Sequence, residues 1–144
     1  MKAENMVRFS FYSRSVNEGF ARGALASFLA QADPTVPELA DIKTAVSEAV
    51  TNCIVHAYPE GVGLVYMSIA LYSDGTVKIT VSDKGIGIQD VEQAMQPMFT
   101  TGSPEERAGL GFAVMQSFMD KVKVTSRPGH GTKVVMSKTL ERRG

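Results

Sequence analysis

The sequence predicts an α+β fold in two layers, a mixed but mostly antiparallel β-sheet with its helices on one face. Short segments in which apolar and polar residues alternate are typical of half-buried strands, and longer segments with apolar residues every three or four positions are typical of helices. These segments follow one another in the order β-α-α-β-β-loop-α-β-β. Helices gathered on one face of an antiparallel sheet are the economical way to bury both layers.

Length and composition narrow the class of protein. The 144 residues predict a single domain over residues 1–144. Fifteen Lys and Arg balance fifteen Asp and Glu, and this zero net charge argues against direct nucleic-acid binding. The single cysteine excludes an internal disulfide and a cysteine-rich zinc site. No apolar run approaches the roughly 20 residues of a membrane span, and no signal peptide is visible, so a soluble cytoplasmic protein is expected.

The first strand and helix are predicted from alternation and capping. Residues 6–12 alternate, with Val7, Phe9 and Phe11 on the face that is expected to be buried. Ser15 and Glu18 have the spacing of a capping box, so a helix is expected from there to about residue 31. Its expected core positions are Phe20, Leu25, Phe28 and Leu29. The Asp33-Pro34 pair should end it, because a residue before proline avoids the α-helical region.

A second capping box and a hairpin follow. Thr35 and Glu38, with a proline between them, should open a helix that runs to about Ala57. Its apolar stripe is Leu39, Ile42, Val46, Ala49 and Cys53. Two strands are predicted at about 63–72 and 76–82, joined by a Ser-Asp-Gly turn.

The remaining third contains a long segment rich in glycine and proline. Residues 83–111 are predicted to form a loop with one short helix near 90–95, and a loop of this length in a small domain is usually functional or disordered. A helix should begin at about Gly109 and run to Met119. Two closing strands are expected at 122–125 and 133–136.

Three groups of residues could carry chemistry. Glu48, Asn52 and His56 are four residues apart and therefore share one side of the second helix. A carboxylate there can act as a general base and an amide oxygen can hold a hard cation, but a solvent-facing polar edge would have the same spacing. The other two groups are rich in glycine.

The first glycine group is Asp83-x-Gly85-x-Gly87, directly after a strand. Its glycines allow a tight turn and close approach of a flat ligand, although an ordinary turn would look similar. The second is Gly109-Leu110-Gly111, expected to open a helix whose free amides and dipole favour phosphate. No Walker A pattern is present, which excludes a P-loop. Thr132, after Gly131, could add a polar contact or simply serve as a strand former.

Taken in order, these groups resemble the GHKL (Bergerat) ATP-binding fold of gyrase, ninety-kilodalton heat-shock chaperones and histidine kinases. Glu48-x-x-x-Asn52 matches its N box, Asp83-x-Gly85-x-Gly87 and Gly109-Leu110-Gly111 match its glycine boxes, and Gly131-Thr132 matches its last motif. Phe20-Ala21-Arg22, the segment 47–52 with His56, and Gln96-Pro97-Met98-Phe99-Thr100-Thr101 are similar to the bacterial anti-sigma-factor serine kinases. The resemblance covers essentially the whole chain and is closest to the members that act in sporulation.

The resemblance implies a role for each motif residue. Asn52 would coordinate Mg²⁺ bridging the phosphates of ATP or ADP, and Asp83, assisted by Thr132, would bind the adenine amino group. Glu48 would be the general base that takes a proton from the attacking serine hydroxyl of an anti-anti-sigma factor. Phosphoryl transfer depends largely on positioning and charge neutralisation. The glycines of both boxes and Leu110 would line the nucleotide site.

The resemblance also implies a lid and partner surfaces. Residues 97–108 would form the ATP lid, with Thr100 and Thr101 at its start and Arg107 near the terminal phosphates. Glu18 and Arg22 would belong to a surface that the sigma factor and the anti-anti-sigma factor share, although their spacing alone predicts only an ordinary ion pair. A homodimer that uses the first strand and helix is implied as well.

The expected function is therefore an anti-sigma factor that is also an ATP-dependent protein-serine kinase. It would inhibit a sporulation sigma factor and phosphorylate a serine of the anti-anti-sigma factor with Mg-ATP, without direct contact to nucleic acid or a membrane. Two alternatives stay open at this point. One is a kinase of the stress-response anti-sigma-B type, and the other is a nucleotide-gated sigma-binding module with little kinase activity.

Overall fold

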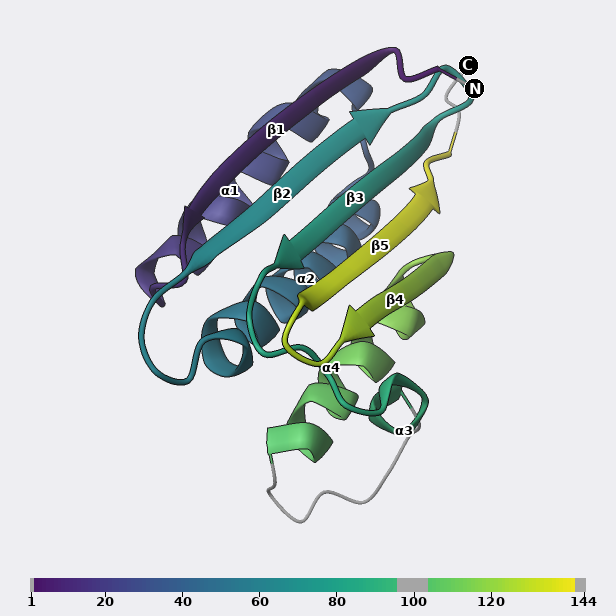
Figure 1. Cartoon of the computed structure of the whole chain (residues 1–144). Helices are drawn as coiled ribbons and strands as arrows, with labels where there is room; N and C mark the ends of the chain where they lie inside the picture. Colours follow the sequence, from purple (N-terminus) through teal and green to yellow (C-terminus); the bar gives the residue numbers. More distant parts are fainter. Residues whose placement is uncertain (1, 96–103, 142–144) are drawn as a thin grey trace.

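The structure is a computed structural model that describes residues 2–95 and 104–141, with the side chains of the second stretch described from Leu110 onward. A five-stranded sheet with the order β1-β2-β3-β5-β4 forms one layer, and every pairing in it is antiparallel. The helices cover one face of this sheet (Figure 1). The strands are β1 Asn5–Tyr12, β2 Leu64–Leu71, β3 Thr76–Asp83, β4 Lys121–Arg127 and β5 Gly131–Thr139. The predicted two-layer α+β fold is thereby confirmed.

Among the residues that the structure describes, four helices and two short helical turns make up the other layer. The helices are α1 Val16–Leu29, α2 Val36–Asn52, α3 Val91–Met95 and α4 Pro104–Phe118. A 3₁₀ turn at Ala30–Ala32 extends α1, and a π-helical turn at Cys53–Ala57 extends α2. Helix α2 packs between α1 and α4, which places its two long sides against different neighbours (Figure 1).

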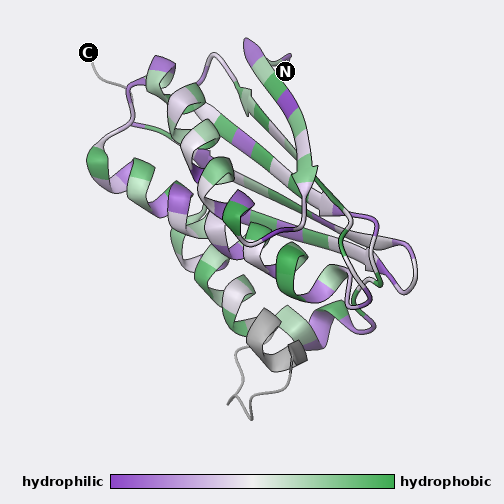
Figure 2. Cartoon of the chain, turned by 90° about the vertical axis from the view of Figure 1, so that its left-hand side faces the viewer, coloured by the Kyte–Doolittle hydropathy of each residue, from purple (hydrophilic) through white to green (hydrophobic). Residues whose placement is uncertain are grey.

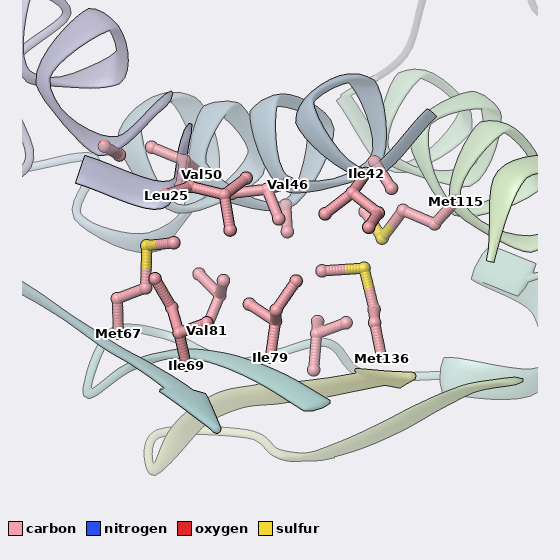
Figure 3. Close-up of a cluster of buried hydrophobic side chains, with 14 of the residues drawn as sticks. Leu25, Ile42, Val46, Val50, Met67, Ile69, Ile79, Val81, Met115 and Met136 are labelled. Carbon is pink, nitrogen blue, oxygen red and sulfur yellow. The ribbon is translucent and has the colours of Figure 1, made fainter. Parts of the chain in front are cut away.

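Alternation in the strands produces the core. Phe11 is buried and Val7 and Phe9 are half-buried on the face of β1 that was expected to be inside. Figure 2 shows the same alternation as bands of opposite hydropathy along the strands. Between the layers, Val46 and Val50 of α2 face Ile69 and Ile79 of the sheet (Figure 3). All four side chains are fully buried, so apolar surface removed from water is what joins the two layers.

The N-terminus of α2 has the predicted capping box. The Thr35 side chain accepts a hydrogen bond from the Glu38 N–H at 3.1 Å, and the Glu38 carboxylate accepts one from the Thr35 N–H at 2.8 Å. Thr35 is in the extended conformation that this motif needs. The helix therefore begins where the sequence predicts it.

The capping box predicted at α1 is wrong. Ser15 has helical backbone angles, φ −57° and ψ −32°, and its side chain makes no capping hydrogen bond. An N-cap hydroxyl reaches the first-turn amides from the extended region, which Ser15 does not occupy. Glu18 is engaged elsewhere: its carboxylate accepts a hydrogen bond from the Ser47 hydroxyl of α2 and pairs with Arg22 at 2.8 Å.

Two further expectations are corrected. Phe20 was predicted in the core but is 57% exposed, although its ring packs edge-on against Phe9 at 5.9 Å between centroids. Helix α4 begins at Pro104 and not near Gly109. Proline is favoured at the first helical position because its missing N–H is unpaired there in any case. Gly109 and Gly111 consequently lie inside the helix, and the amides expected at its N-terminus belong to earlier residues.

Candidate active site

A pocket opens between α2, its π-helical turn and the adjacent ends of β3 and β5. Its empty volume, open mouth included, is about 430 Å³. The lining is mostly apolar, with a few polar groups. It consists of Ala49, Asn52, Cys53, His56, Ala57, Val81, Asp83, Gly87, Ile88, Phe112, Thr132 and Val134.

Asp83 is the buried carboxylate of this pocket. It is 7% exposed at the end of β3. One carboxylate oxygen, Oδ1, accepts hydrogen bonds from the N–H of Gly85 at 2.9 Å and of Thr132 at 3.3 Å. Two backbone amides therefore fix this oxygen, and neither of these hydrogen bonds uses Oδ2.

Cys53 lies beside Asp83 in the pocket wall and is 5% exposed. Burial raises the pKa of the Cys53 thiol, and the charge of Asp83 and a hydrogen bond to its carboxylate raise that pKa further. The thiol therefore stays protonated and is a donor rather than a nucleophile. The sequence analysis placed Cys53 only in the apolar stripe, and nothing in its local pattern indicates this contact.

Three glycines allow the segments around Asp83 to meet. A Cβ atom at Gly85 would overlap the Ala57 carbonyl, and one at Gly131 would overlap the carbonyl of Asp83 itself. Gly87 has φ +77°, which only glycine adopts readily, and it lies against the carbonyl of Arg127. The end of α2, the first glycine box and the β4–β5 turn are thus in backbone contact.

Thr132 is placed as expected, but its two polar groups have different partners. Its N–H contacts Asp83, while its hydroxyl pairs with the Ser126 hydroxyl at 2.8 Å. Ser126 also accepts a hydrogen bond from the Ile88 N–H at 2.7 Å and donates one to the Gly131 carbonyl at 2.9 Å. Sequence reasoning missed Ser126, because a serine near the end of a predicted strand carries no local signal for such a role.

The polar stripe of α2 meets α4 at Gly111. A Cβ atom at Gly111 would lie 3.1 Å from Glu48 Oε2 and 3.2 Å from Asn52 Nδ2. Glu48 and Asn52 are half-buried, and Gly111 is buried. His56, one turn further along, lines the pocket. The structure therefore brings together the N box and the second glycine box, which are 59 residues apart at Asn52 and Gly111.

Asn52 contains a buried polar atom with no hydrogen-bond partner among the described residues, its Nδ2. A buried unpaired amide is costly and rare in folded proteins, and a ligand with oxygen atoms would satisfy it. The chain carries no cluster of three His, Cys, Asp or Glu side chains among the described residues that could hold a metal ion. A cation here would need ligand atoms from a bound molecule as well as from Asn52.

The structure describes the remaining predicted site residues only in part. Thr100 and Thr101 lie outside the described residues, as does most of the expected lid. Arg107 and Gly109 lie in α4, but their side chains are not described. Leu110 is 44% exposed. The pocket also has apolar walls, such as Phe112, that the sequence analysis did not single out.

Comparison with known proteins agrees with this arrangement. Residues 13–138 match the family model described as the histidine kinase-like ATPase domain. The chain is 56% identical over 142 residues to an anti-sigma F factor from Caldanaerobacter subterraneus, covering 99% of both chains. It is 53% identical over 138 residues to the anti-sigma F factor of Pasteuria penetrans, covering 95% of this chain and 92% of that one.

Solved structures of lower identity share the fold. The structure of the RsbU and RsbW domains of a Mycobacterium tuberculosis protein superposes with a TM-score of 0.71 at 20% identity, covering 97% of this chain and 34% of that one. A blue-light activated histidine kinase from Erythrobacter litoralis superposes with a TM-score of 0.59 at 23% identity, covering 85% of this chain and 61% of that one. No helix among the described residues is long and apolar enough to cross a bilayer.

The family and the fold predicted from the motifs are both confirmed. The GHKL ATPase domain implies that the chain binds ATP, and the class expected for the enzyme, an ATP-dependent protein-serine kinase, is the class of this family. From its motifs, its fold and its full-length similarity, the chain belongs to the anti-sigma F factors of the histidine kinase-like ATPase superfamily.

Proposed function

We propose that this chain binds a sigma factor of the F type and uses Mg-ATP to phosphorylate a serine of the matching anti-anti-sigma factor. The observation that carries the proposal is the contact of Glu48 and Asn52 with Gly111, next to a pocket that contains Asp83. Asp83 is buried inside the pocket, and Glu48 lies one helical turn before Asn52, which lines the pocket. This arrangement supports recognition of the adenine base by Asp83 and acceptance of the serine proton by Glu48.

Adenine recognition is assigned to Asp83. Two backbone amides hold its Oδ1. Its Oδ2 accepts a hydrogen bond from the exocyclic amino group of adenine. The apolar walls formed by Ile88, Val134 and Phe112 suit the faces of a purine ring. Gly87 and Thr132 complete this end of the site.

Magnesium is assigned to the other end of the pocket. Asn52 would be the protein ligand of the ion, since Mg²⁺ usually keeps several waters and takes few protein ligands. When bound, Mg²⁺ supplies neutralisation of the charge on the phosphates. Asn52 would bind the ion through its amide oxygen, while its unpaired Nδ2, a hydrogen-bond donor, suits a neighbouring phosphate oxygen. The space left by the missing Cβ of Gly111 supports a ligand at this place.

Glu48 is assigned as the general base. Its carboxylate lies one helical turn before Asn52 on the same side of α2. It accepts the proton of the serine hydroxyl as that oxygen attacks the γ-phosphorus, while the bond from the γ-phosphorus to the bridging oxygen breaks and ADP leaves. Thr100, Thr101, Arg107, Gly109 and Leu110 are assigned to the lid and to the phosphate end of the site by their match to the family motifs.

The surface for protein partners is assigned to α1. The Arg22 side chain is 45% exposed and is paired with Glu18, whose carboxylate also accepts the hydrogen bond from Ser47. Arginine is enriched among the residues that dominate protein interfaces. Homodimerisation through β1 and α1 is part of the same proposal, and the exposed ring of Phe20 supports it.

The test is phosphate transfer with matched carboxylate variants. The purified chain is incubated with labelled Mg-ATP and its anti-anti-sigma factor, and label on the partner's serine is followed. Glu48→Gln should lower the rate about 10²–10⁴-fold, the usual contribution of a general base, while ADP affinity measured by calorimetry stays unchanged. The control is Glu60→Gln, at an exposed position in the α2–β2 connection.

Two results would contradict the proposal. Normal transfer by Glu48→Gln would remove this residue as the base. Failure of the unaltered chain to bind adenine nucleotides would remove the kinase function altogether.

A further inference from the structure

Tyr58, which directly follows the π-helical turn of α2, has no part in the proposed chemistry but makes two hydrogen bonds to the segments around the pocket. Its hydroxyl donates to the carbonyl of Leu64 at 2.6 Å and accepts from the N–H of Lys84 at 2.9 Å. These two residues are the first of β2 and the first after β3. One hydroxyl therefore connects the end of α2, the start of β2 and the start of the first glycine box.

The Tyr58 ring is held in a defined position. A Cβ atom at Gly63 would overlap ring atoms of Tyr58, so the ring packs directly on the backbone of Gly63. Burial and the charge of Asp83 raise the pKa of the Tyr58 hydroxyl, although its hydrogen bond with the Lys84 backbone acts in the opposite direction. The hydroxyl is protonated at neutral pH, as donation to Leu64 requires.

The contact matters because of which amide it holds. The three consecutive amides after Asp83 all have partners: Lys84 N–H donates to Tyr58, Gly85 N–H to Asp83 Oδ1 at 2.9 Å, and Ile86 N–H to the Ala57 carbonyl at 2.9 Å. The Lys84 N–H belongs to the peptide group that also contains the Asp83 carbonyl. Fixing this peptide fixes the backbone from which the Asp83 carboxylate projects.

We propose that Tyr58 is a positioning residue for nucleotide recognition: its hydroxyl holds the Asp83–Lys84 peptide so that the Asp83 carboxylate faces the adenine amino group. The inference rests on the proposed role of Asp83. The hydroxyl does not touch the ligand itself. Its loss should therefore weaken adenine binding without altering the transfer step.

The test is Tyr58→Phe, which keeps the ring and removes both hydrogen bonds. ADP should bind about three- to tenfold more weakly, as expected when hydrogen bonds of ordinary net strength are lost. The KM for ATP should rise by a similar factor while kcat is unchanged, because Glu48 and Asn52 are not affected. Amide exchange at Lys84, followed by NMR, should become faster.

Two companion variants make the test specific. Tyr66→Phe is the matched control, because the Tyr66 ring lies 5.2 Å from the Lys84 ammonium and phenylalanine keeps that contact. It should leave ADP affinity within twofold. Gly63→Ala keeps the Tyr58 hydroxyl but displaces the ring, and it should weaken ADP binding in the same direction. Unfolding temperatures show whether each variant is folded.

The outcomes separate this inference from the proposed function. Unchanged ADP affinity in Tyr58→Phe, or equal losses in Tyr58→Phe and Tyr66→Phe, would overturn the role of Tyr58. Asp83→Asn is measured alongside. If it weakens ADP binding and Tyr58→Phe does not, only the role of Tyr58 is wrong. If Asp83→Asn has no effect, both the adenine assignment and the role of Tyr58 are overturned.

Discussion

Several glycines in this protein matter because the absence of a side chain lets neighbouring parts of the chain come close together. Gly85, Gly87 and Gly131 each lie against the backbone carbonyl of another segment, and a side chain at any of them would separate those segments. Gly111 does the same for side chains, because it lets α4 approach Glu48 and Asn52. At Gly111 the missing Cβ leaves space beside Glu48 and Asn52. The backbone of Gly111 is helical, so its conformation does not require glycine.

Gly111→Ala separates these two roles. Alanine favours a helix over glycine by about 1 kcal/mol. This gain offsets part of the destabilisation caused by local crowding, so the free energy of unfolding should fall by no more than the crowding alone would cause. The new methyl group, 3.1 Å from Glu48 Oε2 and 3.2 Å from Asn52 Nδ2, should nevertheless lower the rate of phosphate transfer at least tenfold. Transfer assays and urea unfolding measure the two quantities.

The control for this variant is Gly61→Ala in the exposed α2–β2 connection, where a Cβ would meet nothing within 4 Å. It should raise stability slightly and leave transfer unchanged. Equal transfer rates in Gly111→Ala and the unaltered protein would show that the space beside Gly111 is not used by the reaction.

At the scale of elements, α2 carries most of the site and its two ends are built differently. A complete capping box fixes its start, and a π-helical turn follows Asn52. Such turns occur frequently at functional sites. Here the turn ends at Ala57, whose carbonyl accepts the Ile86 N–H at 2.9 Å. The helix is thereby fastened to the first glycine box.

Removal of the two candidate cap residues, Thr35 and Ser15, should change the stability of the protein by different amounts. Thr35→Ala should lower the free energy of unfolding by about 0.5–2 kcal/mol, because it removes a hydrogen bond to an otherwise unpaired first-turn amide. Ser15→Ala should change it by less than about 0.5 kcal/mol, the usual range for surface substitutions, because Ser15 makes no capping bond. Urea unfolding of both variants is the measurement. A larger loss for Ser15→Ala would contradict the capping assignment.

For the whole molecule, the central position of α2 separates the proposed partner surface on α1 from the proposed nucleotide site. Ser47 on α2 contacts Glu18 of α1, and the next residue, Glu48, lies against Gly111 of α4. The proposed partner surface and the proposed nucleotide site are thus on opposite sides of one helix. Separate substitutions should be able to affect one without the other.

Arg22→Ala tests this separation. It should weaken sigma-factor binding about tenfold or more, as truncation of an interface arginine commonly does, while ADP affinity stays within twofold. The control is Arg8→Ala on β1, an exposed residue whose strand position faces away from the helices. Calorimetry with each ligand measures both effects. Similar losses from both variants would place the partner surface elsewhere.

Local sequence determined the elements of this protein, because each depends on neighbours within a few residues. Alternation placed β1, periodicity placed α2, and Thr35 with Glu38 marked where α2 begins. The motif residues Glu48, Asn52 and Asp83 were also recognisable, since their spacing is local. Ser15 shows the limit: its spacing to Glu18 suits a cap, but Ser47, 29 residues beyond Glu18, engages that carboxylate instead.

Only the tertiary structure decided how these elements meet. The contact of Gly111 with Asn52, the hydrogen bond of Tyr58 with Lys84 and the role of Ser126 join residues that no short pattern relates. The exposure of Phe20 was likewise decided by tertiary packing and not by its position in the helical pattern. The reason is physical: hydrophobic patterning specifies which face of an element is buried, but packing of the layers specifies which residues of different elements touch.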